Sequence, residues 1–434
     1  MAPARTDTVR TRLLARLGGR RRTLHIGGVD AAELAARFGT PLYVYDAEIL
    51  RAQVAAVRKA FGARLDVLYA VKANPCVAVA QVLRAAGTGA ELASAGEIHV
   101  AHAAGFAGAH MHFAGPAKSV VDLETALDLG VSTVNLESAS EHARLARLAR
   151  ARGARPGVAI RVNPNRETSG ARVRMAGGSK KFGVDEDAVV ELARAIVRTD
   201  QCELRGLHVY TGSQSFDAGA WVAAAERLYA LGQDVERAVG HRLASLNFGG
   251  GFGIPCFDGD PTFDLAAAGR GLRALVGASR RGPRCHLELG RYLVAEAGVF
   301  LTRVLETKRS SGKDFALLDG GMHQFGAAAG LGAVIKRPYP IVACGRPRAD
   351  KTAPWTLAGP LCTPADEFGV DVALPSLQAG DLIAVLVAGA YGLTFSPTGF
   401  LSHPTPAEVL VDGGTVRLAR QRGRPEDSLR GQTW

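Results

Sequence analysis

The sequence has little that would cross-link it or hold it in a membrane. Its 434 residues include only six cysteines, without Cys-x-x-Cys spacing, which argues against a zinc site and against a disulfide framework. No apolar run reaches the ~18 residues that a membrane-spanning helix needs. Arginines also interrupt the N-terminal stretch where a secretory signal would be apolar. These absences predict a cytoplasmic chain with neither metal nor membrane partner.

Nucleic-acid-binding motifs are missing as well, although the formal net charge is +11. Arginines crowd the two ends of the chain and predict a basic N-terminal tail over 1–22, rather than a short amphipathic helix, and a second tail over 421–434. This charge would steer an anionic cofactor, an anionic substrate or an acidic protein partner. We expect no nucleic acid partner.

Between residues 46 and 302, short apolar stretches alternate with stretches rich in Ala, Leu and Arg. About eight strand–helix repeats over roughly 250 residues are typical of an α/β fold of the (β/α)8 barrel type. The rival, a doubly wound open sheet, needs a Gly-rich turn after its first strand, which Lys72-Ala73-Asn74 is not. The expected strands are 65–72, 87–93, 109–114, 131–137, 157–163, 204–211, 243–248 and 284–289, and the expected helices include 47–60, 75–85, 95–104, 138–152, 185–198 and 218–239.

Beyond residue 302 the helical stretches stop, and a second, β-rich domain is expected over 303–420. Residues 23–45, with the apolar run Leu42-Tyr43-Val44-Tyr45, are expected to add a strand to it. A turn at Asp412-Gly413-Gly414 predicts a hairpin. The expected strands are 299–308, 315–318, 340–343, 382–387, 408–411 and 415–419.

Reactive residues and glycines stand where barrel strands are expected to end, and these ends share one face of a barrel. Lys72 ends the first strand, where desolvation or a nearby cation would make its amine a nucleophile for carbonyls. Gly249-Gly250-Gly251 follows the seventh strand and offers bare backbone amides to an anion. Glu288 and Arg291 follow the eighth strand, and Tyr210-Thr211-Gly212-Ser213 follows the sixth.

Five segments identify a family resemblance. They are Tyr69-Ala70-Val71-Lys72-Ala73-Asn74, Gly249-Gly250-Gly251-Phe252, Glu288-Leu289-Gly290-Arg291, Gly359-Pro360-Leu361-Cys362-Thr363-Pro364-Ala365-Asp366 and Gly389-Ala390-Tyr391-Gly392. In this order they resemble the pyridoxal-phosphate-dependent decarboxylases of diaminopimelate, ornithine and arginine. The resemblance implies the alanine-racemase-like fold, a (β/α)8 barrel plus a β domain completed by N-terminal residues. It also implies pyridoxal 5′-phosphate as cofactor and a homodimer with shared active sites.

The resemblance also implies individual roles. Lys72 would bind the cofactor aldehyde covalently, and Glu288 would keep the pyridine nitrogen protonated. Cys362 would return a proton to the substrate carbon after CO2 leaves, and Tyr391 would lie beside the cofactor, both in the partner subunit's site. The remaining cofactor-binding residues would be Glu91, Arg161, Tyr210, Ser213, Gly249, Gly250, Gly251, Gly290 and Arg291, and the substrate-binding residues would be Cys362, Thr363, Asp366, Arg337 and His208.

Two positions depart from the family pattern. Tyr210 stands where the family has a histidine stacked on the cofactor; a tyrosine can stack but cannot supply a cationic face. His208 lies two residues upstream on the same strand face. Thr363 replaces an acid that helps diaminopimelate decarboxylases recognise the distal ammonium of the substrate, which argues against a free diamino acid. Asp366, used by ornithine-type enzymes, is retained.

Further segments resemble a narrower branch that includes the butirosin-pathway decarboxylase of a glutamyl group on an acyl carrier protein, and exosortase-associated relatives. They lie at 175–183, 321–324, 336–340 and 396–404. The predicted function is pyridoxal-phosphate-dependent decarboxylation of the α-amino acid head of a modified or carrier-tethered biosynthetic substrate. The basic surface would suit an acidic carrier protein.

Three alternatives stay open. The chain could decarboxylate free diaminopimelate, ornithine, lysine or arginine. It could racemise an amino acid, although Glu288 and Cys362 argue against this. It could also be a non-catalytic pyridoxal-phosphate-binding regulator, which would be expected to have lost Lys72, Cys362 or the glycine loop.

Overall fold

The computed structural model describes residues 8–18, 22–165, 171–174, 181–277, 282–333 and 336–433. The chain divides into two compact units. Unit 1 comprises 1–50, 255–260 and 294–434, and unit 2 comprises 51–254 and 261–293. The sequence pattern gave no sign that the stretch Pro255–Asp260, which interrupts unit 2 along the chain, belongs to unit 1.

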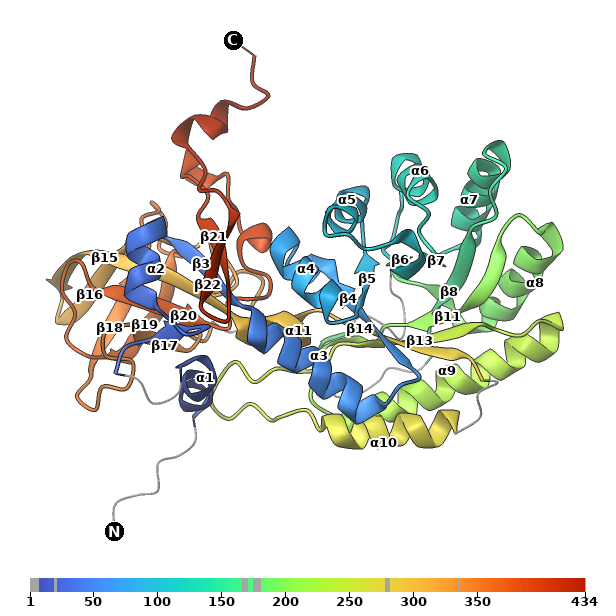
Figure 1. The fold of residues 1–434 in the computed structure, drawn as a ribbon, viewed down its shortest axis with the longest axis horizontal. Coiled ribbons are helices and arrows are strands. Elements are labelled where there is room, and N and C mark those ends of the chain that lie inside the picture. Colours follow the sequence, from blue (N-terminus) through green and yellow to red (C-terminus); the bar gives the residue numbers. More distant parts are fainter. Residues whose placement is uncertain are drawn as a thin grey trace. The chain divides into compact units, whose positions relative to one another are not determined.

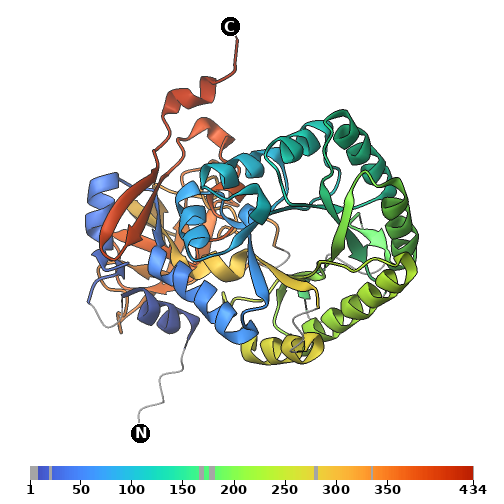
Figure 2. The same cartoon turned by 45° about the vertical axis from the view of Figure 1, so that its right-hand side comes forward.

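Unit 2 contains a closed barrel of eight parallel strands, and Figure 2 shows the ring of strands inside a ring of helices. Neighbouring strands pair in chain order, and the last strand pairs with the first in parallel and closes the sheet. The predicted (β/α)8 barrel is therefore confirmed. Its strands are β4 (Leu65–Ala70), β5 (Gly89–Leu92), β6 (Met111–Phe113), β7 (Thr133–Leu136), β8 (Gly157–Asn163), β11 (Glu203–Val209), β13 (Ser245–Gly250) and β14 (Arg284–Leu289).

Local capping sets where several of the surrounding helices begin. Ser94, Ser119 and Ser138 each accept a hydrogen bond from a backbone N–H in the first turn of the following helix, which satisfies a donor that the helix itself cannot pair. The helices are α3 (Ala47–Phe61), α4 (Val77–Ala85), α5 (Ala95–Ala103), α6 (Val120–Asp128), α7 (Ala139–Ala151), α8 (Val189–Thr199), α9 (Ala218–Val239), α10 (Leu265–Val276) and α11 (Arg291–Val294). Shorter elements are η1 (Val71–Ala73), η2 (Gly108–His110), β9 (Ala171–Arg174), β10 (Val184–Asp185), η3 (Glu186–Ala188) and β12 (Gly212–Ser215).

Unit 1 is built on a mixed nine-stranded sheet with the main order β19-β18-β16-β15-β3-β21-β22 (Figure 1). The N-terminal strand β3 (Leu42–Asp46) pairs antiparallel with β15 (Gly298–Ser310) and parallel with β21 (Ala407–Asp412). The expected contribution of an N-terminal strand to this sheet is therefore confirmed. The other strands are β16 (Lys313–Leu318), β17 (Ile341–Ala343), β18 (Ala353–Ala358), β19 (Glu367–Leu374), β20 (Leu382–Leu386) and β22 (Thr415–Arg420). Smaller elements are β1 (His25–Ile26), β2 (Val29–Asp30), α2 (Ala31–Phe38), η4 (Ala295–Ala297), η5 (Leu393–Phe395), η6 (Phe400–Ser402) and η7 (Pro425–Leu429).

The N-terminal residues differ from the expected basic tail. Val9–Gly18 forms the helix α1, which buries Leu13, Leu14 and Leu17. Arg12 and Arg16 form ion pairs with Glu296, whose side chain is 2% exposed. The arginines therefore have a buried partner almost 300 residues away along the chain, which no local sequence pattern indicates. No helix of the described ranges is long and apolar enough to cross a membrane.

Candidate active site

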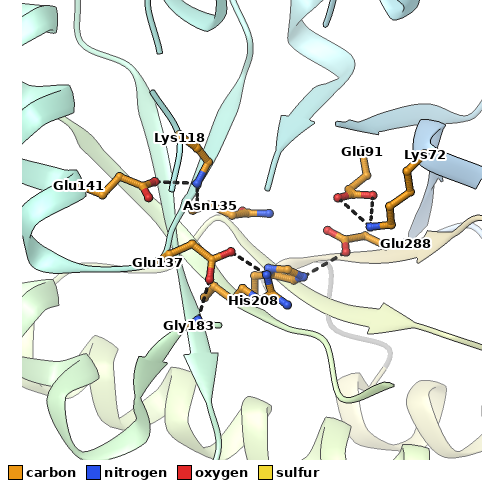
Figure 3. A network of polar contacts seen from close by, with 10 residues as sticks. Lys72, Glu91, Lys118, Asn135, Glu137, Glu141, Gly183, His208 and Glu288 are labelled. Carbon is orange, nitrogen blue, oxygen red and sulfur yellow. Dashed lines mark hydrogen bonds and ion pairs between the residues drawn. The ribbon is translucent and has the colours of Figure 1, made fainter. Parts of the chain in front are cut away.

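Lys72 lies at the C-terminal end of the barrel strands, in the turn η1 that directly follows β4. Its Nζ is 3.1 Å from Oε2 of Glu91, a residue of β5 (Figure 3). The side chain of Glu91 is 2% exposed, whereas that of Lys72 is 38% exposed. Burial raises the pKa of Glu91, and the charge of Lys72 partly offsets this. The amine of Lys72 is thus held by a buried carboxylate, while the lysine side chain as a whole stays partly exposed.

Glu288 lies in β14 and is held by residues of two neighbouring strands. His208 Nε2 on β11 is 3.1 Å from Glu288 Oε2, and Asn247 on β13 donates a hydrogen bond of 2.7 Å to Oε1. Burial would raise the pKa of this carboxyl, but His208, with Lys72 and Arg161, outweighs it and lowers the pKa to about 2. Glu288 is therefore a buried carboxylate that stays ionised.

The glycine loop is tied to Glu288 through Asn247, whose Oδ1 accepts a hydrogen bond of 3.0 Å from the N–H of Gly249. Gly251 has φ +75°, and a Cβ there would lie 1.9 Å from the carbonyl oxygen of Gly212. Only glycine suits such a position. The next residue, Phe252, is buried against the rings of Phe61, Phe263, Trp221 and Tyr292. The loop is thus fixed at both ends, with bare backbone between them.

The other sequence-predicted residues of unit 2 lie at the same end of the barrel. Lys72 Nζ is 5.7 Å from the centre of the Tyr210 ring. Ser213 follows Gly212, whose carbonyl packs on Gly251. A Cβ on Gly290 would lie 2.9 Å from that of Ala73, next to Lys72, and Arg291 begins α11. Gly212 thus packs on the glycine loop, and Gly290 packs on the turn that carries Lys72.

Sequence reasoning missed a second charged group at this end of the barrel. The predicted residue Arg161 donates a hydrogen bond of 2.6 Å to Glu137, which was not singled out. Lys118 donates to Glu141 (2.6 Å) and to the backbone carbonyl of Asn135 (2.7 Å). Figure 3 shows Lys118, Glu137 and Glu141 across the network from Lys72. Glu137 directly follows β7, and Lys118 lies between β6 and α6. Their positions after barrel strands are the feature of the sequence from which their place at this end of the barrel could have been predicted.

Five of the predicted residues lie in unit 1. Cys362 is the one exposed cysteine of the six, all of which are free thiols. Thr363 accepts a hydrogen bond from the N–H of Ala365. Tyr391 has φ +53°, in the left-handed region that costs a non-glycine residue free energy. Arg337 pairs with Asp260 at 3.3 Å.

Asp366 is bound by backbone groups of unit 1. Its carboxylate is buried and accepts hydrogen bonds from the N–H groups of Met322 (2.6 Å) and Leu361 (2.8 Å). Burial raises its pKa, and these backbone hydrogen bonds partly offset the increase. Asp366 thus fixes the loop that carries Cys362, and its contact with the substrate stays a prediction.

The branch-specific segments lie partly outside the described residues. Outside them lie residues 175–180 of the first segment. The structure describes the other three segments, 321–324, 336–340 and 396–404, all in unit 1. Among the described residues, no group of three or more His, Cys, Asp or Glu side chains is arranged to hold a metal ion.

Comparisons with known proteins identify the family of the chain. Residues 47–295 match the family of the pyridoxal-dependent decarboxylases, pyridoxal binding domain. The chain is 36% identical to L-glutamyl-[BtrI acyl-carrier protein] decarboxylase of Niallia circulans, over 92% of this chain and 96% of the relative. It is 38% identical to diaminopimelate decarboxylase of Deinococcus radiodurans, over 91% and 96%.

Solved structures show the same fold over nearly the whole chain. Diaminopimelate decarboxylase of M. jannaschii in complex with L-lysine superimposes with a TM-score of 0.86 at 27% identity, covering 96% of this chain and 97% of that chain. The Helicobacter pylori enzyme, also with L-lysine, gives 0.84 at 29% identity, covering 92% and 98%.

The residues of unit 2 fit pyridoxal 5′-phosphate. An ionised Glu288 suits a protonated pyridine nitrogen, bare amides in a glycine loop suit a phosphate, and the accessible amine of Lys72 suits an aldehyde. When bound, the cofactor supplies a sink for the electron pair left behind as CO2 departs. The chain therefore belongs to the pyridoxal-phosphate-dependent decarboxylase family with the alanine-racemase-like fold, and it is an amino-acid decarboxylase that uses this cofactor.

Proposed function

We propose that this enzyme decarboxylates the α-amino acid head of a biosynthetic substrate whose other end is modified or attached to a carrier protein. One observation carries this proposal. Asp366 is the only acid in the loop 359–366, and its carboxylate is buried and bound by two backbone amides. A substrate with a free distal ammonium would therefore meet no exposed carboxylate in this loop. The similarity to an L-glutamyl-[acyl-carrier protein] decarboxylase supports the same substrate class.

In this proposal the residues of unit 2 hold the cofactor. Lys72 binds its aldehyde, and Glu91 orients the amine before the cofactor arrives. Glu288 binds the pyridine nitrogen, with His208 and Asn247 fixing its two oxygens. Tyr210 and Arg161 line the pocket. The phosphate would be bound by Gly249, Gly250, Gly251, Ser213, Gly290 and Arg291.

Cys362 is proposed as the donor that returns a proton to the substrate carbon. Changing Cys362 to Ala should leave cofactor binding intact, because the residues proposed to hold the aldehyde, the pyridine nitrogen and the phosphate lie in unit 2, whereas the thiol lies in unit 1. Turnover should fall by about 100-fold, or products of misplaced protonation should appear. CO2 release and product analysis by mass spectrometry check this. Normal turnover with a single product would mean that another group donates the proton.

We also propose a homodimer in which Cys362 and Tyr391 serve the partner subunit's site. Inactive Lys72→Ala and Cys362→Ala chains, when mixed and allowed to exchange subunits, should regain about a quarter of the wild-type activity, because mixed dimers then contain one intact shared site. If each site were built from one chain, mixing would restore nothing.

The substrate is tested by measuring CO2 release from L-glutamate on an acyl carrier protein and from free diaminopimelate, lysine, ornithine and arginine. We expect turnover of the carrier-bound substrate and little of the free amino acids. Brisk turnover of free diaminopimelate would instead favour the second candidate, to which the similarity of several diaminopimelate decarboxylases points.

A further inference from the structure

Two of the branch-specific segments, 321–324 and 396–404, converge in unit 1, although about 80 residues separate them along the chain. The rings of His323 and His403 lie 4.8 Å apart between centres. Gln324 Nε2 donates a hydrogen bond of 2.9 Å to the carbonyl oxygen of Pro404. The N–H of Gly326 donates 2.8 Å to the hydroxyl of Ser396. The segments therefore form one cluster, and none of its residues belongs to the proposed cofactor site.

Polar atoms in this cluster are buried without partners. His323 is 0% exposed, and neither of its ring nitrogens has a hydrogen-bond partner among the described residues. The same holds for Oε1 of Gln324, which is 3% exposed. A buried polar atom without a partner costs free energy, so three such atoms on adjacent residues need an explanation. A ligand that supplies the missing hydrogen bonds is one.

The hydrogen-bonding capacity of the cluster indicates the chemistry of that ligand. Burial lowers the pKa of His323 to about 4, with a smaller contribution from the nearby His403. The ring of His323 is therefore neutral near pH 7. A neutral imidazole has one N–H donor and one acceptor nitrogen, and Gln324 Oε1 adds a second acceptor. An amide offers both a carbonyl and an N–H and can satisfy donor and acceptor together. An ammonium can only donate, and a carboxylate can only accept.

The surroundings of the cluster suit an arm that also has apolar parts. Because His323 has no exposed surface, an arm reaches its ring only when a neighbour moves. His403 is partly exposed and its ring contacts that of His323, so it is the residue that would turn aside. Phe400 and Leu401, just before His403, are 44% and 46% exposed, and Phe395 is 48% exposed. Asp366 accepts hydrogen bonds from both Met322, which precedes His323, and Leu361, which precedes Cys362. The cluster is thus tied to the loop of the proposed proton donor.

We propose that His323, Gln324 and His403 form a subsite that binds a neutral, amide-bearing arm on the distal end of the substrate. This proposal rests on the proposed function and specifies how an extended substrate is told from a free amino acid. His323 donates to an amide carbonyl of the arm, and its other nitrogen or Gln324 Oε1 accepts from an amide N–H. The exposed apolar residues cover the methylene and methyl groups of the arm.

The test compares two probes on the cofactor-loaded enzyme, free L-glutamate and L-glutamate joined through its side-chain carboxyl to pantetheine as a thioester. In His323→Leu, kcat/KM for the thioester should fall about 10- to 100-fold, while kcat/KM for free glutamate should change less than about threefold. His323→Gln, which keeps a donor and an acceptor, should recover most of the loss. The visible spectrum of the bound cofactor should stay unchanged in both variants.

The matched control is His142→Leu. His142 is also a buried histidine with an unpartnered ring nitrogen, but it lies on α7 in unit 2. This variant should leave the ratio between the two probes unchanged. A second measurement avoids turnover altogether: pantetheine alone, titrated calorimetrically, should bind the wild type and bind His323→Leu at least about 10-fold more weakly.

The outcomes separate the subsite from the proposed function. If the wild type prefers the thioester but His323→Leu keeps that preference, the subsite is wrong and the carrier-linked substrate stands. An equal loss on both probes would make His323 a structural residue. If the wild type neither binds pantetheine nor prefers the thioester, both the subsite and the carrier-linked substrate are overturned.

Discussion

Two lysines stand at the C-terminal end of the barrel strands in unit 2, and their surroundings are opposite. The side chain of Lys72 is 38% exposed and lies 3.1 Å from one carboxylate, Glu91. The side chain of Lys118 is 1% exposed and lies 2.6 Å from Glu141, with a backbone carbonyl as a further acceptor. Both follow a strand, and both have an acidic partner. Access to solvent is what separates them.

This difference teaches which of two strand-end lysines can do chemistry. Burial lowers the pKa of Lys118 and raises that of Glu141, while their mutual attraction works against both changes. The ammonium of Lys118 is enclosed by acceptors and cannot reach an aldehyde without breaking a buried pair. The side chain of Lys72 is partly exposed, so it can turn from Glu91 to a ligand at a smaller cost than Lys118 can leave Glu141. We therefore expect Lys72 to act in chemistry and Lys118 to act in stability.

The largest effect should come from Lys72→Ala. Without the amine, the cofactor cannot be held covalently, so the visible absorbance of lysine-bound pyridoxal phosphate should vanish and activity should fall by at least about 10³-fold. The melting temperature of the cofactor-free protein should fall less than in the Lys118 variant. Each change leaves a buried carboxylate unpaired, but only Lys118 is itself fully buried. An absorption spectrum and a CO2-release assay measure both losses. Retained absorbance would show that another lysine binds the cofactor.

The opposite pattern is expected for Lys118→Ala. Removing one member of a buried ion pair leaves Glu141 unpaired and should cost about 3–5 kcal/mol of unfolding free energy. The cofactor should still attach to Lys72 and give its usual spectrum. Urea denaturation measures the loss.

A double variant, Lys118→Met with Glu141→Leu, is the control for this prediction. It removes both charges and fills a similar volume, so most of the lost stability should return. If the double variant is as unstable as Lys118→Ala, then packing rather than the unpaired charge is responsible. If Lys118→Ala lost the cofactor spectrum at unchanged stability, the distinction between the two lysines would fail.

The smallest expected effect is a change of stability with pH that is linked to Glu97, a carboxyl influenced by the charge of Lys72. Burial, and secondly Glu91, raises the pKa of Glu97 to about 7 from a usual value of 4.5. Because the folded-state pKa is raised, the stability linked to this group is present below about pH 4.5 and is lost as the pH rises to about 7. Glu97→Gln should therefore match the wild type at pH 4.5 and exceed it by about 1–3 kcal/mol at pH 8. If the difference in unfolding free energy between the two proteins stays constant from pH 4.5 to pH 8, the raised pKa of Glu97 is contradicted.

Local patterns were enough to predict most of the fold. All eight barrel strands and the hairpin of β21 and β22 were expected within a few residues, because apolar runs and glycine turns are properties of neighbouring residues. The helix α1 was not expected. Its arginines suggested a solvated tail, and only the distant Glu296 makes them part of a packed element.

The site was predictable where one short segment carries the chemistry, as with Lys72 or the glycine loop. It was not predictable where distant segments supply partners to each other. Glu137 and Lys118 look like ordinary loop charges until Arg161 and Glu141 are beside them. The backbone N–H groups of Met322 and Leu361, which bind the two oxygens of Asp366, likewise cannot be foreseen from the loop that carries it. The meeting of His323 with His403 depends on tertiary structure alone.

The way the chain divides has a practical consequence for engineering. Unit 1 is made of three separate stretches, and the polypeptide passes from one unit to the other four times. No single cut releases either part as a continuous fragment. A gene fusion that exchanges only the C-terminal half would leave β3 of the old enzyme inside the new sheet and α1 of the old enzyme in the new unit 1. Chimeras that aim to transplant substrate preference therefore have to exchange all three stretches together.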